Sequence, residues 1–461
     1  MGIFGAMTTA ITGLRAQSTA LEHISNNIAN SQTLAYKRTD TSFAELLPES
    51  SPREQALGVV QAASRPTNTV QGDISNSEIT TFSAINGDGY FIVGQQVGTS
   101  DGLPVFSDED LFSRRGDFEI DKNGNLKNGA GYFLKGLPIN AQTGNTSGSL
   151  PEIIQITNDF LAASATTEID YRANLPSFPI TSAQDDTVTN SELLDPVPAD
   201  ATFSNDPTVG GDEVVVGSDA TTFIDRSVSG GAITVFDAGG QALSVQLRWG
   251  KVDSVANGGT DTWNLFYLTD ATATGTDTAW TNLGTNYIFG ADGQLTPSVT
   301  TVTITGMTIE GNNIGDITLD HGANGITQFS DSNGLVKVTA LEQNGFAAGE
   351  RTAVSITDDG RVNVSYSNGQ AVDLAQIVLA SFFSDNDLQK LDGGTFRATQ
   401  ESGTAIFSAQ GNIVGRALEN SNTDIADEFT KLIVTQQAYA ANTRIVSTGD
   451  EMLQEALNMV R

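Results

Sequence analysis

Both ends of the chain carry a stripe of mainly apolar residues spaced alternately three and four positions apart. The N-terminal stripe comprises Met7, Ile11, Leu14, Ser18, Leu21, Ser25 and Ile28. The C-terminal stripe comprises Ile425, Phe429, Leu432, Gln436, Tyr439, Thr443, Val446, Asp450, Leu453, Leu457 and Val460. A mean spacing of 3.5 residues is typical of a helix that packs along one narrow line against another helix. The pattern therefore predicts two terminal helices, neither of which can bury its stripe without a partner.

An ordinary amphipathic helix in a single core produces the same pattern more often, but two features favour assembly between copies. Small or polar residues interrupt both stripes, which suits an adjustable and partly hydrated helix contact. The C-terminal stripe also continues to Gly449 without a Gly or Pro, longer than the ~10–14 residues usual in globular proteins. We therefore predict a self-assembly seam, formed by Met7, Ile11, Leu14, Leu21, Ile28, Ile425, Phe429, Leu432, Tyr439, Val446, Leu453 and Leu457.

Between the helices the period of the apolar positions falls to two, which indicates strands and hairpins. A strand is predicted at Tyr90–Val93, and hairpins at 118–126 and 354–366, each with an Asp- or Asn-rich turn containing Gly. Residues 35–75 are polar and contain Pro48, Pro52 and Pro66, so we expect them to be extended or irregular.

The middle of the chain, residues 151–340, has a different composition. It holds 24 Asp and Glu against five Lys and Arg, a net charge of about −19, together with all three tryptophans. Alternating segments predict strands at Ala242–Trp249 and Trp263–Leu268, whereas 181–230 is predicted to form long loops or a small subdomain.

The order helix, β, acidic β insert, β, helix predicts a nested, multidomain α+β fold. We expect residues 1–40 and 419–461 to form a helical, coiled-coil-like assembly domain. Residues 41–150 and 341–418 are then a β-rich middle domain, and 151–340 an acidic outer β domain. In the simplest folding of this order, both termini meet at one end and the insert lies at the other.

Charge and composition exclude several classes of protein. The net charge of −32 excludes a nucleic-acid binder and disfavours docking to an anionic membrane. No apolar run approaches the ~20 residues of a membrane span, so we expect no membrane insertion. The chain has no cysteine, and its first residues lack the basic leader of a cleavable signal peptide. We therefore expect a protein without disulfides that leaves the cell, if it does, by a route without a cleaved leader.

Motifs for catalysis or metal binding are weak, and we predict no enzyme, no metal and no cofactor. The two histidines, His23 and His321, have no partners at the spacing of a metal site. Residues 121–125 begin like a calcium loop, but Gly is missing at the sixth position and Tyr132 stands where Glu is needed. The tripeptide Arg115-Gly116-Asp117 resembles an adhesion motif, yet its place at the start of a hairpin favours a structural role.

Several longer motifs resemble those of the bacterial flagellar rod and hook protein family. They are Gly5-Ala6-Met7, Thr12 to Gln17, Ser25 to Asn30 and Tyr36-Lys37-Arg38 near the N-terminus. Two further motifs, in the β-rich part that follows the N-terminal helix, are Ile85 to Val93 and Arg114 to Phe118. Near the C-terminus they are Leu418 to Asp424, Gln436, Tyr439, Ala441-Asn442 and Asp450 to Leu453. Together these motifs cover about the first 145 and the last 120 residues, and their combination is highly specific.

Two positions depart from the family pattern. Ala35 stands where the family usually has Gly, which predicts a negative φ at this turn. Gly449 stands where relatives commonly carry Ala, which predicts a C-terminal helix weakened by up to ~1 kcal/mol.

The resemblance implies a structural subunit that polymerises with itself, and the large β insert resembles the longer hook members of the family. Such subunits form a curved, flexible tube that joins the rod to the filament and transmits torque as a universal joint. The implied partners are other copies of the chain, the flagellar rod and hook–filament junction proteins, the hook cap and the flagellar type III export apparatus. The implied location is the extracellular flagellum. The alternatives are a distal rod protein or, in another class, a secreted β-rich adhesin or carbohydrate-binding protein.

Overall fold

The computed structural model describes residues 3–46, 59–100, 102–140, 143–157, 159–185, 187–195, 203–407 and 411–459. They form two compact units. The first unit comprises residues 1–159, 351–365 and 371–461, and the second comprises 160–350 and 366–370. The second unit is therefore an insertion between two halves of the first, and it overlaps the acidic insert expected at 151–340.

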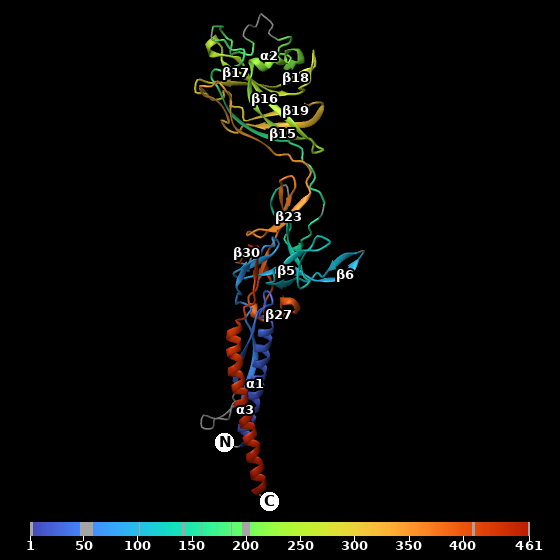
Figure 1. Ribbon diagram of the computed structural model, residues 1–461, viewed down its shortest axis with the longest axis vertical. Coiled ribbons are helices and arrows are strands. Elements are labelled where there is room, and N and C mark those ends of the chain that lie inside the picture. The colour runs from blue at the N-terminus through green and yellow to red at the C-terminus, as the bar shows by residue number, and fades with distance from the viewer. Residues whose placement is uncertain are drawn as a thin grey trace. The chain divides into compact units, whose positions relative to one another are not determined.

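Two long helices of the first unit, α1 (Ile3–Ala29) and α3 (Ile425–Met459), lie side by side (Figure 1). Their contacts show that they run antiparallel, since Met7 meets Gly449 and Asn27 meets Glu428. The Asp424 carboxylate accepts the backbone N–H of Ala426 at 2.8 Å and so caps the start of α3. The predicted terminal helices are confirmed, and Gly449 does not interrupt α3.

The N-terminal helix ends at Ala29, well before residue 40, the predicted limit of the N-terminal part of the helical domain. The reason is local: the Asn30 side chain donates to the backbone carbonyl of Asn26 at 2.9 Å, and Ser31 Oγ donates to that of Ile28 at 2.8 Å. Polar side chains that bond the backbone in this way compete with the helix ladder.

A hairpin of β1 (Thr39–Leu46) and β2 (Val59–Pro66) packs against α1. Eight residues of each strand pair antiparallel, from Thr39 opposite Pro66 to Leu46 opposite Val59. The segment was expected to be extended or irregular, and the sequence did not show that its two described arms pair with each other. An isolated two-stranded sheet is marginal in water, so the helix beneath it is what stabilises this hairpin.

The rest of the first unit is a body of short strands, in which strands from the two chain halves pair with each other. Before the insertion come β3 (Ile74–Asn76), β4 (Ser83–Asn86), β5 (Tyr90–Gly94), β6 (Gln96–Ser100), β7 (Leu103–Phe106), β8 (Leu111–Ser113), β9 (Phe118–Ile120), β10 (Leu126–Asn128), β11 (Phe133–Pro138) and β12 (Glu152–Ile153). After it come β23 (Arg351–Ile356), β24 (Arg361–Tyr366), β25 (Ala371–Gln376), β26 (Leu379–Ser381), β27 (Gln389–Lys390), β28 (Thr395–Arg397), β29 (Ile406–Phe407), β30 (Asn412–Gly415) and β31 (Ala417–Glu419).

Pairs such as β3–β31, β4–β30, β8–β28 and β11–β25 join the two halves across the insertion. Tyr90, Ile92, Phe112, Phe382 and Phe396 form part of a core between them. The predicted strand at 90–93 and the hairpins at 118–126 and 354–366 are confirmed. The first unit cannot complete its core until both halves of the chain are present.

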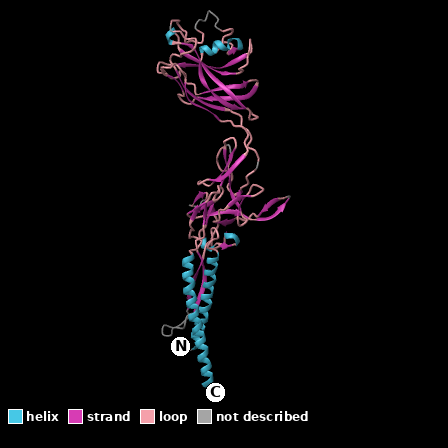
Figure 2. Ribbon diagram, viewed as in Figure 1, coloured by secondary structure: helices cyan, strands magenta, loops and turns pink. Residues whose placement is uncertain are grey.

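The regular structure of the second unit is mainly β-strand, with loops between the strands (Figure 2). One five-stranded sheet holds β13 (Glu168–Leu175), β19 (Thr301–Ile309), β20 (Asn312–Asp320), β21 (Ile326–Gln328) and β22 (Lys337–Gln343). The other holds β14 (Val214–Val216), β15 (Val228–Phe236), β16 (Ala242–Asp253), β17 (Asp261–Leu268) and β18 (Thr278–Phe289), and α2 (Ala220–Arg226) is its short helix. Trp249 and Trp263 are fully buried in a core that both sheets share, and Trp280 is buried in a smaller cluster beside α2.

The predicted strands at 242–249 and 263–268 are confirmed as parts of β16 and β17. Within 181–230, the described residues hold β14, α2 and connecting turns, and residues 186 and 196–202 lie outside the description. Among the described helices, none has the length and apolar character needed to cross a membrane.

The expectation of a negative φ at Ala35 is wrong. Ala35 adopts a φ of +55° and is buried. Its N–H donates to the backbone carbonyl of Glu419 at 2.9 Å, which ties the turn after α1 to β31. This long-range contact holds the backbone in the left-handed region despite the Cβ atom.

Candidate assembly surface

The contact between α1 and α3 is built from small and polar side chains. Ala10 and Ala20 of α1 are buried, as is Thr435 of α3. A Cβ atom added at Gly13 would lie 3.0 Å from Asn442 Nδ2, so the Asn442 side chain packs directly against the Gly13 backbone. Little large apolar surface is therefore used to hold the helices to each other.

Large apolar side chains instead remain exposed on the outer faces of the two helices. They are Phe4, Ile11, Ile425, Phe429, Ile433, Val434, Tyr439, Ile445, Met452, Leu457 and Met459. Phe43 and Leu46 of the β1–β2 hairpin are exposed as well. Soluble monomers rarely expose contiguous apolar surface on this scale, so these faces are typical of an interface with another chain.

None of the predicted seam residues is fully buried inside the molecule. Ile11, Ile425, Phe429, Tyr439 and Leu457 are exposed, and the partly buried members are Met7, Leu14, Leu21, Ile28, Leu432, Val446 and Leu453. Val460 of the sequence stripe lies outside the described residues. The seam is therefore available, wholly or in part, to a partner.

The stripe that the helices do bury against each other lies one residue before the seam. On α1 it includes Ala10, Gly13, Ala20, Ile24 and Asn27, and on α3 it includes Glu428, Thr435, Asn442 and Gly449. These positions also step by threes and fours, but most are small or polar and escape a search for apolar residues. Phe4, Ile433, Val434, Ile445, Met452 and Met459 were missed for another reason, since they fall off the single 3.5-residue line.

A polar cluster joins both helices to the hairpin. The fully buried Glu428 accepts from Asn27 Nδ2 at 3.2 Å and from Lys431 Nζ at 2.7 Å. Lys431 also lies 3.2 Å from the Asp40 carboxylate on β1. Burial alone lowers the pKa of Lys431, but the hydrogen bond and the charge of Glu428, reinforced by Asp40, outweigh it and raise this pKa.

A second buried cluster fastens the start of the hairpin to the β body. Lys37 Nζ lies 2.5 Å from Glu419 Oε1, and the same oxygen accepts the Gly72 N–H at 3.0 Å. The Arg114 guanidinium lies 3.6 Å from the other oxygen of Glu419. Burial lowers the pKa of Lys37, with Glu419 opposing the shift. Breaking this ion pair would leave a buried charge without a partner, so the contact between the hairpin and the β body resists separation.

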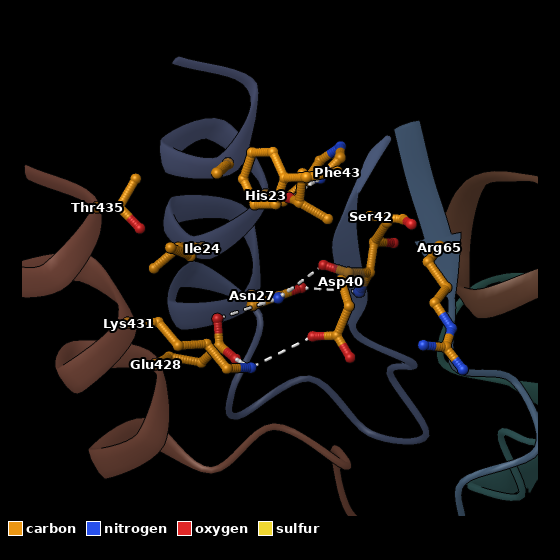
Figure 3. A pocket seen from close by; sticks show the side chains of 13 residues that line it. His23, Ile24, Asn27, Asp40, Ser42, Phe43, Arg65, Glu428, Lys431 and Thr435 are labelled. Atoms are coloured by element: carbon orange, nitrogen blue, oxygen red, sulfur yellow. Dashed lines mark hydrogen bonds and ion pairs between the residues drawn. The ribbon is translucent and has the colours of Figure 1, made fainter. Parts of the chain in front are cut away.

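A cavity of about 400 Å³ opens between α1, the start of α3 and the hairpin. Figure 3 shows His23, Ile24 and Asn27 of α1 on one side, Glu428, Lys431 and Thr435 of α3 on another, and the hairpin residues opposite. The hairpin is held to α1 by His23, whose ring nitrogens lie 2.8 Å from Thr41 Oγ1 and 3.0 Å from Ser64 Oγ.

The other sequence motifs have structural roles. Asp121 Oδ1 accepts the N–H groups of Asn123 and Asn125, which makes a hydrogen-bonded turn. Arg115 and Asp117 bond each other at 2.7 Å. His321 is buried and lies 2.9 Å from the Tyr287 hydroxyl. Across the described ranges, no three His, Asp or Glu side chains are grouped as they would be around a metal ion.

Four family models match successive parts of the chain. "Flagella basal body rod protein" matches residues 7–37, and "Flagellar hook protein FlgE/F/G D1 domain" matches 84–168. "Flagellar basal body protein FlaE D2 domain" matches 219–346, and "Flagellar basal body rod FlgEFG protein C-terminal" matches 414–459. The first and last matches fall on α1 and α3, the helices that carry the seam.

The flagellar hook protein FlgE of Salmonella typhimurium is 30% identical over 462 residues, covering 98% of this chain and 100% of that protein. The chain belongs to the flagellar hook protein family. The hook protein FlgE of Escherichia coli K12 is also 30% identical, with the same coverage, and that of Brucella suis is 27% identical over the full length of both. Membership places the chain in the bacterial flagellum and supports a polymer of hook subunits.

The fold agrees with a solved structure of the family. The crystal structure of the Helicobacter pylori hook protein FlgE2 matches with a TM-score of 0.51 at 15% identity, covering 75% of this chain and 100% of that one. The predicted fold class, terminal helices on a mainly β body, is confirmed.

Proposed function

We propose that this chain is the structural subunit of the flagellar hook. Copies assemble through their terminal helices into a curved, flexible tube that joins the rod to the filament and transmits torque as a universal joint. One observation carries this proposal: α1 and α3 use small residues to contact each other and leave their large apolar residues exposed. A helix pair of this kind gains stability when further helices cover its exposed apolar residues.

Bending of a tube requires neighbouring subunits to slide, and the composition of the seam suits sliding. Polar positions such as Gln436 and Thr443 lie exposed between the apolar ones. Contacts that include such groups and water re-form after a shift with little loss, whereas an interlocked apolar core resists displacement.

The same proposal includes three domains with the limits expected from the sequence. Residues 1–40 and 419–461 form the assembly domain, 41–150 and 341–418 a middle shell domain, and 151–340 an outer domain. Charge supports this division, because residues 160–350 hold about −19 of the net −32, whereas residues 1–50 hold four acids and three bases. Close packing of copies therefore costs less repulsion through the nearly neutral residues 1–50 than through the acidic insert.

We further propose that the tube contacts the rod at one end and the hook–filament junction proteins at the other. In this proposal, subunits are exported through the type III apparatus without cleavage of a leader and assemble beneath the hook cap. Family membership and the absence of cysteine support it, since a chain without disulfides passes unfolded through a narrow channel without reduction.

The test replaces Phe429, an exposed seam residue, by Asp. We expect Phe429→Asp to remain a folded, soluble monomer and to form no tubes at concentrations at which the unaltered protein assembles, as measured by sedimentation and negative-stain microscopy. Phe429→Leu keeps an apolar side chain at the same position and should still assemble. Tubes formed equally well by Phe429→Asp would contradict the proposal.

A further inference from the structure

The side chains described in residues 450–459 of α3 have few contacts with the other described residues. Met7, near the start of α1, contacts Gly449, and α3 then continues for ten residues to Met459. In this segment Met452 is 54% exposed, Leu457 69% and Met459 77%. The helix end therefore presents bare apolar surface.

This helix end is also acidic. Residues 450–459 include Asp450, Glu451 and Glu455 and no Lys or Arg, and the last turn of α3 carries no basic residue. Unsatisfied carbonyl groups add about half a negative charge at a helix C-terminus. The three carboxylates of this segment therefore favour a cation supplied by another surface, and Arg461 lies outside the described residues.

Met452, Glu455 and Met459 are spaced at i, i+3 and i+7, so they lie along one face of the helix. The acidic side chain stands between two long, flexible apolar ones. No ion pair joins Glu455 to another of the described residues.

The cavity at the opposite end of the helix pair has complementary features. Ala20, Ile24 and Phe43 supply apolar walls. Three of the charged residues that line it are paired with one another, because Lys431 bonds both Glu428 and Asp40. Arg65 stands exposed opposite them on β2 (Figure 3), and it has no ion pair within the described part of the chain. The cavity thus offers one uncommitted cation beside an apolar wall.

We infer that the stripe Met452–Glu455–Met459 of one copy docks into this cavity of a second copy, with Glu455 pairing with Arg65 and the two methionines covering Phe43 and Ile24. Met side chains adapt to shifting surroundings, which suits a contact between subunits that slide. This inference rests on the proposed function and names the contact through which it acts.

Geometry requires the two surfaces to come from different molecules. Glu455 lies 24 residues along α3 from Lys431 at the cavity, about 36 Å at ~1.5 Å per residue. One straight helix cannot bring its end back to its own start. Because the donor and acceptor surfaces differ, the contact can repeat head-to-tail from one copy to the next, as a tube requires.

Opposite charge reversals at the two surfaces test the inference. Alone, Arg65→Glu would set two carboxylates against each other across the contact, and Glu455→Arg would set two guanidinium groups against each other. We expect each variant to raise the critical concentration for assembly at least about tenfold, as loss of an interfacial charge pair typically does. Mixed in equal amounts, the two variants should assemble together near the unaltered concentration, because each supplies the surface that the other needs.

Three controls separate this contact from general effects. Helical circular dichroism should show that each single variant is folded, and the double variant Arg65→Glu/Glu455→Arg should assemble on its own. Asp450→Arg makes the same change of charge about 140° around the helix from Glu455. Placed in the same chain as Arg65→Glu, it should not restore assembly, because Glu455 would still face a carboxylate at position 65.

Two results would overturn the inference: unaltered assembly of both single variants, or failure of the mixture and of the double variant to recover. Restoration by Asp450→Arg would also overturn it, since any added cation would then suffice. Each of these results leaves the hook proposal standing. Failure of the unaltered protein to form tubes would instead count against that proposal.

Discussion

Ala35 carries a left-handed backbone conformation that a side chain makes costly. Its φ of +55° is held by the bond from its N–H to Glu419. For an L-residue with a Cβ atom this region costs roughly 1–2 kcal/mol, which glycine avoids.

We predict that Ala35→Gly stabilises the first unit by about 1 kcal/mol. The helical circular dichroism signal measures this unit, because α1 and α3 belong to it and only the seven-residue α2 belongs to the second. Ala20→Gly, at a regular position inside α1, should instead destabilise it. A loss of stability in Ala35→Gly would mean that the freedom gained by the unfolded chain outweighs the strain removed.

The stability of the junction between the two helices and the β1–β2 hairpin depends on pH through Lys431. Its pKa in the folded protein is raised above the ordinary 10.5 by Glu428 and Asp40, against the effect of burial. The folded state therefore keeps the proton to a higher pH than the unfolded state does. Its contribution to stability is complete below pH 10.5 and is lost as the pH rises through the raised value.

We predict that Lys431→Met is less stable than the unaltered protein at about pH 8 and that this difference shrinks above pH 10.5. Urea unfolding followed by the helical signal measures both free energies. Lys431→Arg keeps its charge at every accessible pH and should retain its contribution at about pH 11. If the difference between the unaltered protein and Lys431→Met stays constant with pH, the ion pair does not stabilise the junction.

At the scale of elements, α3 contains Gly449 in its interior, and glycine at such a position normally weakens a helix. A Cβ atom at Gly449 would lie 3.0 Å from Met7 Cγ and 3.4 Å from its Sδ. The atoms that crowd it belong to a flexible side chain, so they can move aside.

We predict that Gly449→Ala stabilises the helix pair by up to ~1 kcal/mol through helix propensity. Amide hydrogen exchange around residues 445–455 should slow. The effect of Gly449→Ala is also measured in a protein that carries Met7→Ala. If Met7 moves aside freely, Gly449→Ala should stabilise the helix pair by the same amount with and without the methionine side chain. A destabilised Gly449→Ala would show that the close approach of α1 and α3 needs glycine here.

At the scale of the whole molecule, the second unit is an insertion that holds most of the charge. Leu161 and Gly349 form an isolated backbone bridge, so the segments that enter and leave this unit lie side by side there. A short Gly-Ser linker in place of residues 161–349 can therefore close the first unit without distorting it.

We predict that this deletion still assembles and that its assembly depends less on salt. Added salt should promote assembly of the complete protein, because like charges repel by ~1 kcal/mol per close pair even in water and salt screens them over ~8–10 Å. The measurement is the critical concentration at several ionic strengths for both proteins. Equal salt dependence would mean that the acidic units of neighbouring copies do not face one another.

The tryptophans provide an independent observation on the complete protein. All three are buried within the second unit. Their fluorescence spectrum should change little on assembly if this unit keeps its own core.

Local features of the sequence were enough to predict the helices, strands and hairpins named above and to locate the acidic segment. The 3.5-residue spacing predicted both terminal helices, and alternation with Asn-Gly and Asp-Gly turns predicted the strand at 90–93 and the hairpins. These signals could be found because they depend on neighbouring residues, through the period of the helix and the strand. The acidic middle segment and the lack of metal-site spacing are equally properties of the chain itself.

Tertiary structure decided which residues meet. The seam could be located on each helix, but only packing showed that the helices bury the adjacent stripe of Ala10, Gly13 and Asn27 and leave larger residues outside. The pairing of β1 with β2, the left-handed Ala35 and the cluster around Glu419 likewise depend on contacts between residues far apart in the chain. The spacing of apolar residues predicts the secondary structure of a segment. Which surface covers each of its faces depends on the shape and charge of segments far away in the sequence.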